Sequence, residues 1–321
     1  MKSFTEVSSL FEEKCNRRHF PDEPAKLYQA AQYMLGIGGK RIRPACVLMT
    51  NELFAPINED SYHVAMAVEL FHNFTLVHDD IMDKAPIRRG LQTVHAKFGE
   101  STAILAGDVL FAQAYDYLMR INPAYLQPVL RIFTKTAKEV CEGQQLDMDF
   151  EEKTGIRMEE YVQMITLKTS VLLAASMQLG AILGGAGAGN QDQLYEFGKY
   201  LGIAFQVQDD YLDTFGDPEK FGKQIGGDIL CNKKTFLWLH AMEVATHTQK
   251  EQLLAFTKNE EPNKVEKVTA IYKMCGVDAW ATSLKKKYLE KALFHLDEVA
   301  VQKVHKQELH KMALYLMQRE S

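Results

Sequence analysis

Apolar side chains recur at helical spacing along most of the chain. This spacing predicts α-helices over residues 24–37, 60–83, 100–119, 124–141, 159–183, 191–213, 233–246 and 277–297. Glycine, proline, asparagine and aspartate interrupt the pattern and predict breaks at 36–44, 121–124, 184–192 and 215–228. No run of alternating apolar and polar residues is long enough to predict a sheet. Since no linker or shift in composition divides the chain, we expect one all-α domain over residues 1–321, built as a helical bundle.

One long segment, residues 170–189, carries no charged side chain over about the length of a membrane span. It also holds Ser176 and Gln178, and it ends in the glycine-rich run Gly-Gly-Ala-Gly-Ala-Gly. These polar and flexible residues favour a buried core helix that runs into a turn. We therefore expect no membrane span.

Composition narrows the class of protein. Of the 321 residues, 46% are apolar and 25% are charged, and 37 basic residues against 42 acidic ones give a net charge of −5. An acidic balance argues against a general nucleic-acid binder. The five cysteines are scattered and never form a C-x-x-C pair, which indicates a reducing compartment and opposes a disulfide framework or a structural zinc site. The N-terminus has no apolar signal-peptide core, so we expect a cytoplasmic protein.

Two acidic motifs stand 130 residues apart, and both read V-x-D-D-x-x-D. Their six carboxylates belong to Asp79, Asp80, Asp83, Asp209, Asp210 and Asp213. Aspartates at i and i+4 share one helix face, where they repel each other unless a cation is present. Each motif lies at the end of an apolar stretch. This position argues against the alternative that the aspartates form an ordinary solvent-exposed helix face. Mg²⁺ prefers one or two carboxylates together with waters and substrate phosphates, so the motifs predict magnesium sites.

Basic residues lie in several short clusters between and around these motifs. The clusters are Gly38–Pro44, Arg88-Arg89, Lys168-Thr169, Lys223 and Lys233-Lys234. Arginine forks and lysine point charges both suit phosphate oxygens, although each cluster alone is more often a solvated surface. We read Lys285-Lys286-Lys287 as such a surface. Together the motifs predict two diphosphate sites, one held through metal ions and one held by cations, with an apolar channel lined by Phe71, Phe74 and residues 170–183.

With these motifs in this order, the chain resembles a trans-isoprenyl diphosphate synthase of the polyprenyl synthetase family over nearly its whole length. The matching segments are GGKRIRP, LVHDDIMD with the following RRG, Lys168-Thr169, and QVQDDYLD with GKQIGGD and NKK. The resemblance implies the all-α isoprenyl diphosphate synthase (class I terpenoid synthase) fold with a central apolar cavity. It also implies a homodimer and three Mg²⁺ ions, for which Mn²⁺ can substitute. The implied reaction joins isopentenyl diphosphate to the carbocation formed from an allylic diphosphate.

The resemblance assigns roles residue by residue. Asp79, Asp83 and Asp209 would bind the metal directly, supported by Asp80, Asp210 and Asp213. Isopentenyl diphosphate would be held by Lys40, Arg43, His72 and Arg89. The allylic diphosphate would be held by Arg88, Lys168, Lys223 and Lys233. Thr169 and Gln206 present oxygens that could stabilise the carbocation. The C-terminus, Gln318 to Ser321, lacks the basic tail of the animal and fungal farnesyl enzymes, so closure of a tail over the site is in doubt.

Product length depends on the residues before the first acidic motif. The resemblance assigns the floor of the channel to Phe74, whereas an ideal helical wheel places Phe71 and Thr75 nearer the carboxylate face. Farnesyl synthases of this motif type often carry a second aromatic residue where this chain has the small Thr75, so the resemblance slightly favours a geranylgeranyl (C20) product over a farnesyl (C15) product.

Three other readings remain open at this point. A class I terpene cyclase would share the fold, a non-catalytic subunit of a heteromeric synthase would share the family, and an HD-type phosphohydrolase would use His78 with Asp79. The second aspartate triplet and the GGKRIRP segment count against the cyclase. Intact aspartates in both motifs count against the non-catalytic subunit.

Overall fold

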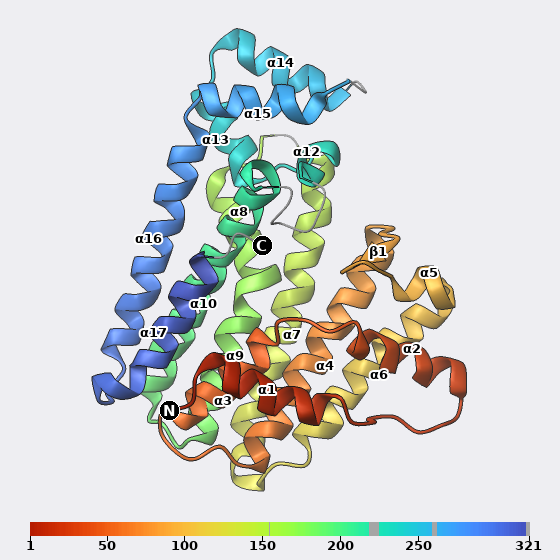
Figure 1. The fold of residues 1–321 in the computed structure, drawn as a ribbon, viewed down its shortest axis with the longest axis vertical. Helices are drawn as coiled ribbons and strands as arrows, with labels where there is room; N and C mark the ends of the chain where they lie inside the picture. The colour runs from red at the N-terminus through yellow and green to blue at the C-terminus, as the bar shows by residue number, and fades with distance from the viewer. Residues whose placement is uncertain (154, 218–224, 259–261, 319–321) are drawn as a thin grey trace. The chain divides into compact units, whose positions relative to one another are not determined.

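The computed structural model describes residues 1–153, 155–217, 225–258 and 262–318 (Figure 1). The chain forms two compact units, each assembled from three stretches of sequence. Unit 1 comprises residues 1–134, 175–195 and 300–309, and unit 2 comprises residues 135–174, 196–299 and 310–321. Helices account for almost all regular structure in the described residues, which confirms the all-α prediction. The single domain over residues 1–321 stays a prediction.

Unit 1 contains six helices and one short hairpin that lie wholly within it. They are α1 (Phe4–Cys15), α2 (Ala25–Gly36), α3 (Ile42–Glu52), α4 (Glu59–Met82), β1 (Ile87–Arg88), β2 (Leu91–Gln92), α5 (Val94–Phe98) and α6 (Glu100–Leu118). The long helices α4 and α6 pack against each other, and α3 packs on α4 (Figure 1). The α4 helix begins with a capping box in which Asn58 and Ser61 each accept the other's backbone N–H.

The hairpin of unit 1 was not predicted, because two-residue strands are too short to show alternation. It pairs Ile87 with Gln92 and Arg88 with Leu91 in antiparallel register. Its two turn residues, Arg89 and Gly90, both have positive φ, at 52° and 77°. Such a turn matches the twist of a two-stranded ribbon. The hairpin places Arg88 and Arg89 directly after the acidic end of α4.

Among the residues of unit 2 that the structure describes, six helices and one π-helical turn lie wholly within the unit. They are α8 (Met158–Ile165), η1 (Thr166–Ser170), α12 (Gly227–Leu230), α13 (Phe236–Val244), α14 (His247–Lys258), α15 (Lys264–Met274) and α16 (Val277–Glu298). Buried Tyr161, Phe236 and Tyr272 belong to its apolar core. Four further helices contribute residues to both units: α7 (Pro123–Glu152), α9 (Val171–Leu183), α10 (Ala188–Phe215) and α17 (Lys303–Gln318).

The helix predicted over residues 159–183, which contains most of the uncharged segment, is present but is not one uniform α-helix. Residues 158–183 form α8, the π-turn η1 and α9 in succession. By length and hydropathy this stretch could span a membrane, yet 78% of its most apolar window is buried within the protein. A core helix passes the same test, so the burial favours our reading of this segment.

Candidate active site

The first acidic motif lies in the last turn of α4 and at its C-cap. Carboxylates at the C-terminal end of a helix interact unfavourably with the negative pole of the helix dipole. The stability of α4 therefore does not explain why three aspartates lie there. Asp79 is half-buried and Asp83 is exposed, whereas Asp80 is only 1% exposed. The three carboxylates of one motif therefore have different surroundings.

Asp80 binds Arg88 of the hairpin rather than facing solvent. Nε of Arg88 donates to both carboxylate oxygens of Asp80 at 2.9 Å, and Nη2 lies 2.8 Å from Oδ1. A guanidinium held in this way has its remaining N–H groups fixed in direction. Asp80 therefore positions an arginine that the sequence assigned to phosphate binding.

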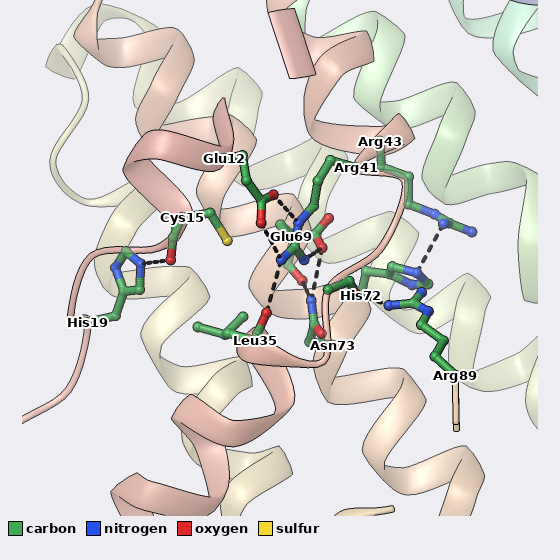
Figure 2. A network of polar contacts seen from close by, with 11 residues as sticks. Glu12, Cys15, His19, Leu35, Arg41, Arg43, Glu69, His72, Asn73 and Arg89 are labelled. Atoms are coloured by element: carbon green, nitrogen blue, oxygen red, sulfur yellow. Dashed lines mark hydrogen bonds and ion pairs between the residues drawn. The ribbon is translucent and has the colours of Figure 1, made fainter. Parts of the chain in front are cut away.

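The GGKRIRP segment leads into α3, which begins at Ile42. Its three cations do not share one environment: Lys40 is exposed, Arg43 is half-buried and Arg41 is buried. The Arg41 guanidinium donates to Glu12, to Glu69 and to the carbonyl oxygen of Leu35 (Figure 2). Lys40 and Arg43 are thus left as the phosphate-binding candidates of the segment.

Three of the residues assigned to isopentenyl diphosphate lie together in unit 1. Nη1 of Arg43 donates to Nε2 of His72 at 3.1 Å, and Arg89 lies beside His72 (Figure 2). Nη1 of Arg89 also donates to the carbonyl oxygen of Gly38, and a Cβ atom at Gly39 would lie 2.7 Å from that nitrogen. Glycine at position 39, with φ of 153°, therefore leaves room for the arginine.

His72 is neutral in this setting. Burial, followed by the positive charges of Arg43 and Arg89, holds its pKa well below 6.5. Since Arg43 is a donor only, Nε2 of His72 accepts the hydrogen bond and Nδ1 carries the proton. A neutral imidazole with a free N–H can donate to a phosphate oxygen.

The second acidic motif lies near the C-terminal end of α10 and lines a pocket of about 270 Å³ within unit 2. The pocket is lined by acids and cations together with Thr169 and Gln206. The acids are Asp147, Glu151, Asp209, Asp210, Asp213 and Asp228, and the cations are Lys168, Lys233 and Lys234. The structure therefore brings together the second motif and all of its predicted partners from unit 2 that it describes. Lys223 lies outside the described residues.

Hydrogen bonds fix several side chains around this pocket. Oγ1 of Thr169 donates to Oε1 of Gln206 at 3.2 Å, and Nε2 of Gln206 donates to Oδ1 of Asp210 at 2.8 Å. The hydroxyl of Tyr161 donates to the other carboxylate oxygen of Asp210. Burial and the neighbouring Asp228 raise the pKa of Asp210 well above its usual range. Thus the second aspartate of this motif, like Asp80, is turned inward and holds other residues.

Several residues of the pocket were given no role from the sequence, and three of them contact residues that were. Asp147 accepts from Nζ of Lys168 at 2.5 Å, Asp228 lies 3.8 Å from Lys233, and Tyr161 holds Asp210. Asp147 stands in a helix rich in charge, where its sequence context resembles that of a surface acid. The one usable signal was the Gly-Gly-Asp sequence at 226–228, since this aspartate follows a glycine turn near the second motif.

Two lysines have roles that differ from those predicted from the sequence, where Lys234 belonged to a candidate phosphate-binding cluster and Lys285 to a solvated surface. Nζ of Lys234 donates to the carbonyl oxygens of Phe150, Glu151 and Lys153, so it caps the C-terminal end of α7. The reading of Lys285 as plain surface was wrong. Its Nζ donates to Oε1 of buried Gln208 at 2.5 Å, and burial lowers its pKa.

The residues before the first motif form an aromatic cluster with α6. The ring of Phe74 stacks on Phe111 with centroids 4.9 Å apart and planes at 16°. Phe71 is 1% exposed and contacts Phe74, Phe111 and Phe133. Thr75 is half-buried and bonds to the carbonyl oxygen of His72 at 2.8 Å. Phe71 is thus packed deeper in unit 1 than Phe74.

His78 contacts α6 rather than the aspartates of its motif. Nε2 of His78 lies 3.1 Å from the carbonyl oxygen of Ile104, and its ring meets that of Phe74 edge to face. A Cβ atom at Gly107 would lie 2.3 Å from Nε2. His78 therefore packs into the space left by a glycine and helps to fix the ring of Phe74.

The donors of the two motifs fit Mg²⁺ by their chemistry. They are hard oxygen ligands, and several aspartates around one pocket favour a cation there. Within the described part of the chain, no three acids, histidines or cysteines are grouped closely enough to hold a metal by themselves.

Comparisons with known proteins identify the family. The polyprenyl synthetase family model matches residues 24–275. A short chain isoprenyl diphosphate synthase of Methanocaldococcus jannaschii is 42% identical over 257 residues, covering 79% of this chain and 78% of that protein. A geranylgeranyl diphosphate synthase of Methanosarcina mazei is 39% identical over 277 residues, covering 85% and 84%. A crystal structure of a geranylgeranyl pyrophosphate synthase matches with a TM-score of 0.95 at 40% identity, covering 100% of both chains. This chain therefore belongs to the polyprenyl synthetase family, whose members are prenyltransferases.

Proposed function

We propose that this protein is a short-chain trans-prenyltransferase. It condenses isopentenyl diphosphate with an allylic diphosphate (dimethylallyl, geranyl or farnesyl) and releases diphosphate. The observation that carries the proposal is the pocket of unit 2, where aspartates of the second motif stand beside Lys168 and Lys233. Such a site suits a diphosphate bound through both metal ions and cations. Relatives named geranylgeranyl and short-chain isoprenyl diphosphate synthases support the same reaction.

The two substrates would be held by different residues. Lys40, Arg43, His72 and Arg89 would bind isopentenyl diphosphate, and Arg88, Lys168, Lys223 and Lys233 would bind the allylic diphosphate. The grouping of Arg43, His72 and Arg89 in unit 1 supports the first assignment. The second is supported by Lys168 and Lys233 in the pocket of unit 2 and by the fixed fork of Arg88 in unit 1.

Asp79, Asp83 and Asp209 would hold three Mg²⁺ ions, with Asp80, Asp210 and Asp213 in support. The metal would neutralise the allylic diphosphate and so make it a better leaving group. Asp80 and Asp210 support the site from behind, because the first fixes Arg88 and the second fixes Gln206.

The chain's own side chains would guide the carbocation that remains when the allylic C–O bond breaks. The hydroxyl of Thr169 and the amide oxygen of Gln206 present lone pairs, which stabilise positive charge. The double bond of isopentenyl diphosphate then attacks the carbocation, forming one C–C bond. The released diphosphate takes the proton that is lost, which yields an allylic product five carbons longer.

The product would be geranylgeranyl diphosphate or farnesyl diphosphate, with Phe74 limiting chain growth. The stack of Phe74 on Phe111 supports this role, because it holds the ring rigidly at a half-buried position. We also propose, from the family, that the enzyme is a cytoplasmic homodimer.

A product assay tests the proposal. The purified protein is incubated with Mg²⁺, labelled isopentenyl diphosphate and each allylic primer in turn, and dephosphorylated products are separated by chain length. The expected result is a labelled C15 or C20 alcohol that requires both substrates. Cyclic hydrocarbon products, formed without isopentenyl diphosphate, would indicate a terpene cyclase instead.

A further inference from the structure

Lys168 and Thr169 lie on an unusual piece of backbone. Between the regular helices α8 and α9, residues Thr166–Ser170 form a single π-helical turn. A π-turn holds one more residue than an α-turn and is rare because its geometry is less favourable. It changes the direction in which the following side chains point. Both Lys168 and Thr169 line the pocket of unit 2.

On one side the π-turn touches α7 at a glycine. A Cβ atom at Gly143 would lie 2.2 Å from the backbone nitrogen of Lys168 and 2.6 Å from the carbonyl carbon of Leu167. Glycine inside a helix costs about 0.5–1 kcal/mol relative to alanine, so helix propensity does not account for it. One turn further along α7, Asp147 accepts from Nζ of Lys168 at 2.5 Å. The same face of α7 therefore contacts both the backbone and the side chain of Lys168.

On the other side the π-turn touches α10 in the same manner. A Cβ atom at Gly202 would lie 2.7 Å from Cα of Ser170. One turn further along α10, Oε1 of Gln206 accepts from the hydroxyl of Thr169 at 3.2 Å. Each neighbouring helix thus offers a glycine to the backbone of the turn and, four residues later, an acceptor to one of its two functional side chains.

We propose that Gly143 and Gly202 are positioning residues for the prenyl transfer. At both positions the backbone of the π-turn lies so close to the neighbouring helix, α7 or α10, that a Cβ atom would not fit. Only glycine, which has no Cβ, allows this packing. This spacing sets the direction of the Lys168 ammonium and the Thr169 hydroxyl toward the allylic diphosphate. The inference rests on the proposed function for the identity of that ligand.

Alanine substitutions test the proposal, and α10 offers a matched control. Gly198 is also a tight position, since its Cβ would lie 2.7 Å from Cα of Ala174, but Ala174 belongs to the regular helix α9. Gly189, also in α10, has no atom within 4 Å of a Cβ and serves as the open control. Gly143→Ala, Gly202→Ala, Gly198→Ala and Gly189→Ala are compared by thermal unfolding, by kcat, and by KM for each substrate.

Wild-type activity is measured first, because its absence would overturn the proposed function and not the positioning role. In the active enzyme, Gly143→Ala and Gly202→Ala should lower kcat/KM for the allylic diphosphate by about tenfold or more, a loss of about 1.4 kcal/mol of transition-state stabilisation. The KM for isopentenyl diphosphate should stay near the wild-type value. Gly198→Ala should lower the unfolding temperature without changing the ratio of the two KM values. Gly189→Ala should leave this ratio unchanged and should not lower the unfolding temperature.

Equal kinetic effects of Gly198→Ala and Gly143→Ala would overturn the inference, because a general loss of packing would then explain both. If Gly143→Ala does not fold, Gly202→Ala decides by the same comparison. Failure of both to fold while Gly198→Ala folds would also overturn it, since the two glycines would then serve the fold rather than the placement of Lys168 and Thr169.

Discussion

The guanidinium of Arg41 donates from Nη1 to Oε1 of Glu69 at 2.5 Å, and the two side chains are only 3% and 5% exposed. This pair links the start of α3 to α4, and a second bond from Arg41 reaches Glu12 of α1 (Figure 2). Arg41 also has a positive φ of 48°, an uncommon backbone conformation for a residue other than glycine. The pair therefore holds a strained segment that carries Lys40 and Arg43 on either side.

Removing one partner of this pair should be costly. Arg41→Met leaves the Glu69 carboxylate buried without its partner, and such a change typically costs about 3–5 kcal/mol in free energy of unfolding. The double variant Arg41→Met with Glu69→Leu removes both charges and should recover most of that loss. Urea unfolding measures both variants. Glu12→Gln is the matched control and should cost less, because the Glu12 side chain is 37% exposed.

If the double variant were as unstable as Arg41→Met alone, the loss would come from packing rather than from an unpaired charge. The double variant also separates stability from placement of the segment. Both variants should have a raised KM for isopentenyl diphosphate, because the αL conformation at position 41 is no longer anchored. In the double variant the KM should stay raised although the free energy of unfolding is recovered.

The aspartate motifs should be essential for turnover. Asp79→Ala or Asp209→Ala each removes a proposed metal ligand and should lower kcat by several orders of magnitude. The fold should survive, since each change relieves repulsion among carboxylates. Steady-state kinetics and circular dichroism measure the two effects. Asp192→Ala, at an exposed position of α10, is the control and should retain full activity. A motif whose variant keeps more than about a tenth of wild-type kcat would not be a metal site, since that loss is only about 1.4 kcal/mol.

The two diphosphates should respond to different lysines. Lys40→Ala should raise KM for isopentenyl diphosphate and largely spare that for the allylic substrate. Lys168→Ala should do the reverse, or lower kcat, because its ammonium lines the pocket of unit 2. Initial rates with one substrate varied at a time give each constant. Equal effects of both variants on both substrates would contradict the assignment.

Acid should destabilise the protein partly through His72. The pKa of His72 in the folded state lies well below 6.5, so the unfolded chain binds its proton first as the pH falls. The contribution of neutral His72 is therefore fully present above about pH 6.5 and is lost progressively below it. Thermal unfolding from pH 7.5 to pH 5 measures the slope. His72→Gln keeps a side chain that can accept from Arg43 and should flatten this slope, and an unchanged slope would mean that other groups cause it.

Product length should depend on the aromatic cluster of α4. Phe74→Ala removes the ring that stacks on Phe111 and should lengthen the product. Adding Phe71→Ala should lengthen it further. Chromatography of dephosphorylated products measures chain length, and Phe11→Leu in the core of unit 1 is the control, with no change expected. An unchanged product from the double variant would place the floor of the channel elsewhere.

Local periodicity in the sequence was enough to find the long helices. The predictions at 60–83, 100–119 and 277–297 match α4, α6 and α16 within one residue at each end. Their apolar side chains repeat with the period of an α-helix over five turns or more, which leaves no competing assignment. Helices such as α1 and α17 were missed, because amphipathic stretches rich in charge resemble loops. The helix α3 was missed because its first turn lies in the glycine- and proline-containing segment 36–44, where we predicted a break.

The candidate site was predicted from residue types at fixed spacing. Two D-D-x-x-D triplets and the intervening basic motifs led us to predict metal and diphosphate binding, which stays a prediction. What the spacing could not show was which members of a cluster face inward. Asp80 and Asp210 are buried against Arg88 and Gln206, and Arg41 is buried between two glutamates.

The direction of each charged side chain was decided only by the tertiary structure. Burying a charge requires a partner at hydrogen-bond distance, and the partners of Arg41, Asp80 and Lys168 lie 6 to 29 residues away along the chain. The π-turn at Thr166–Ser170 has the same origin. Its extra residue rotates the side chains that follow, but α9 is apolar on nearly every side, so the rotation leaves no visible mark in the sequence. Such a turn is stable only where neighbouring helices leave room for it, and here that room is provided by Gly143 and Gly202.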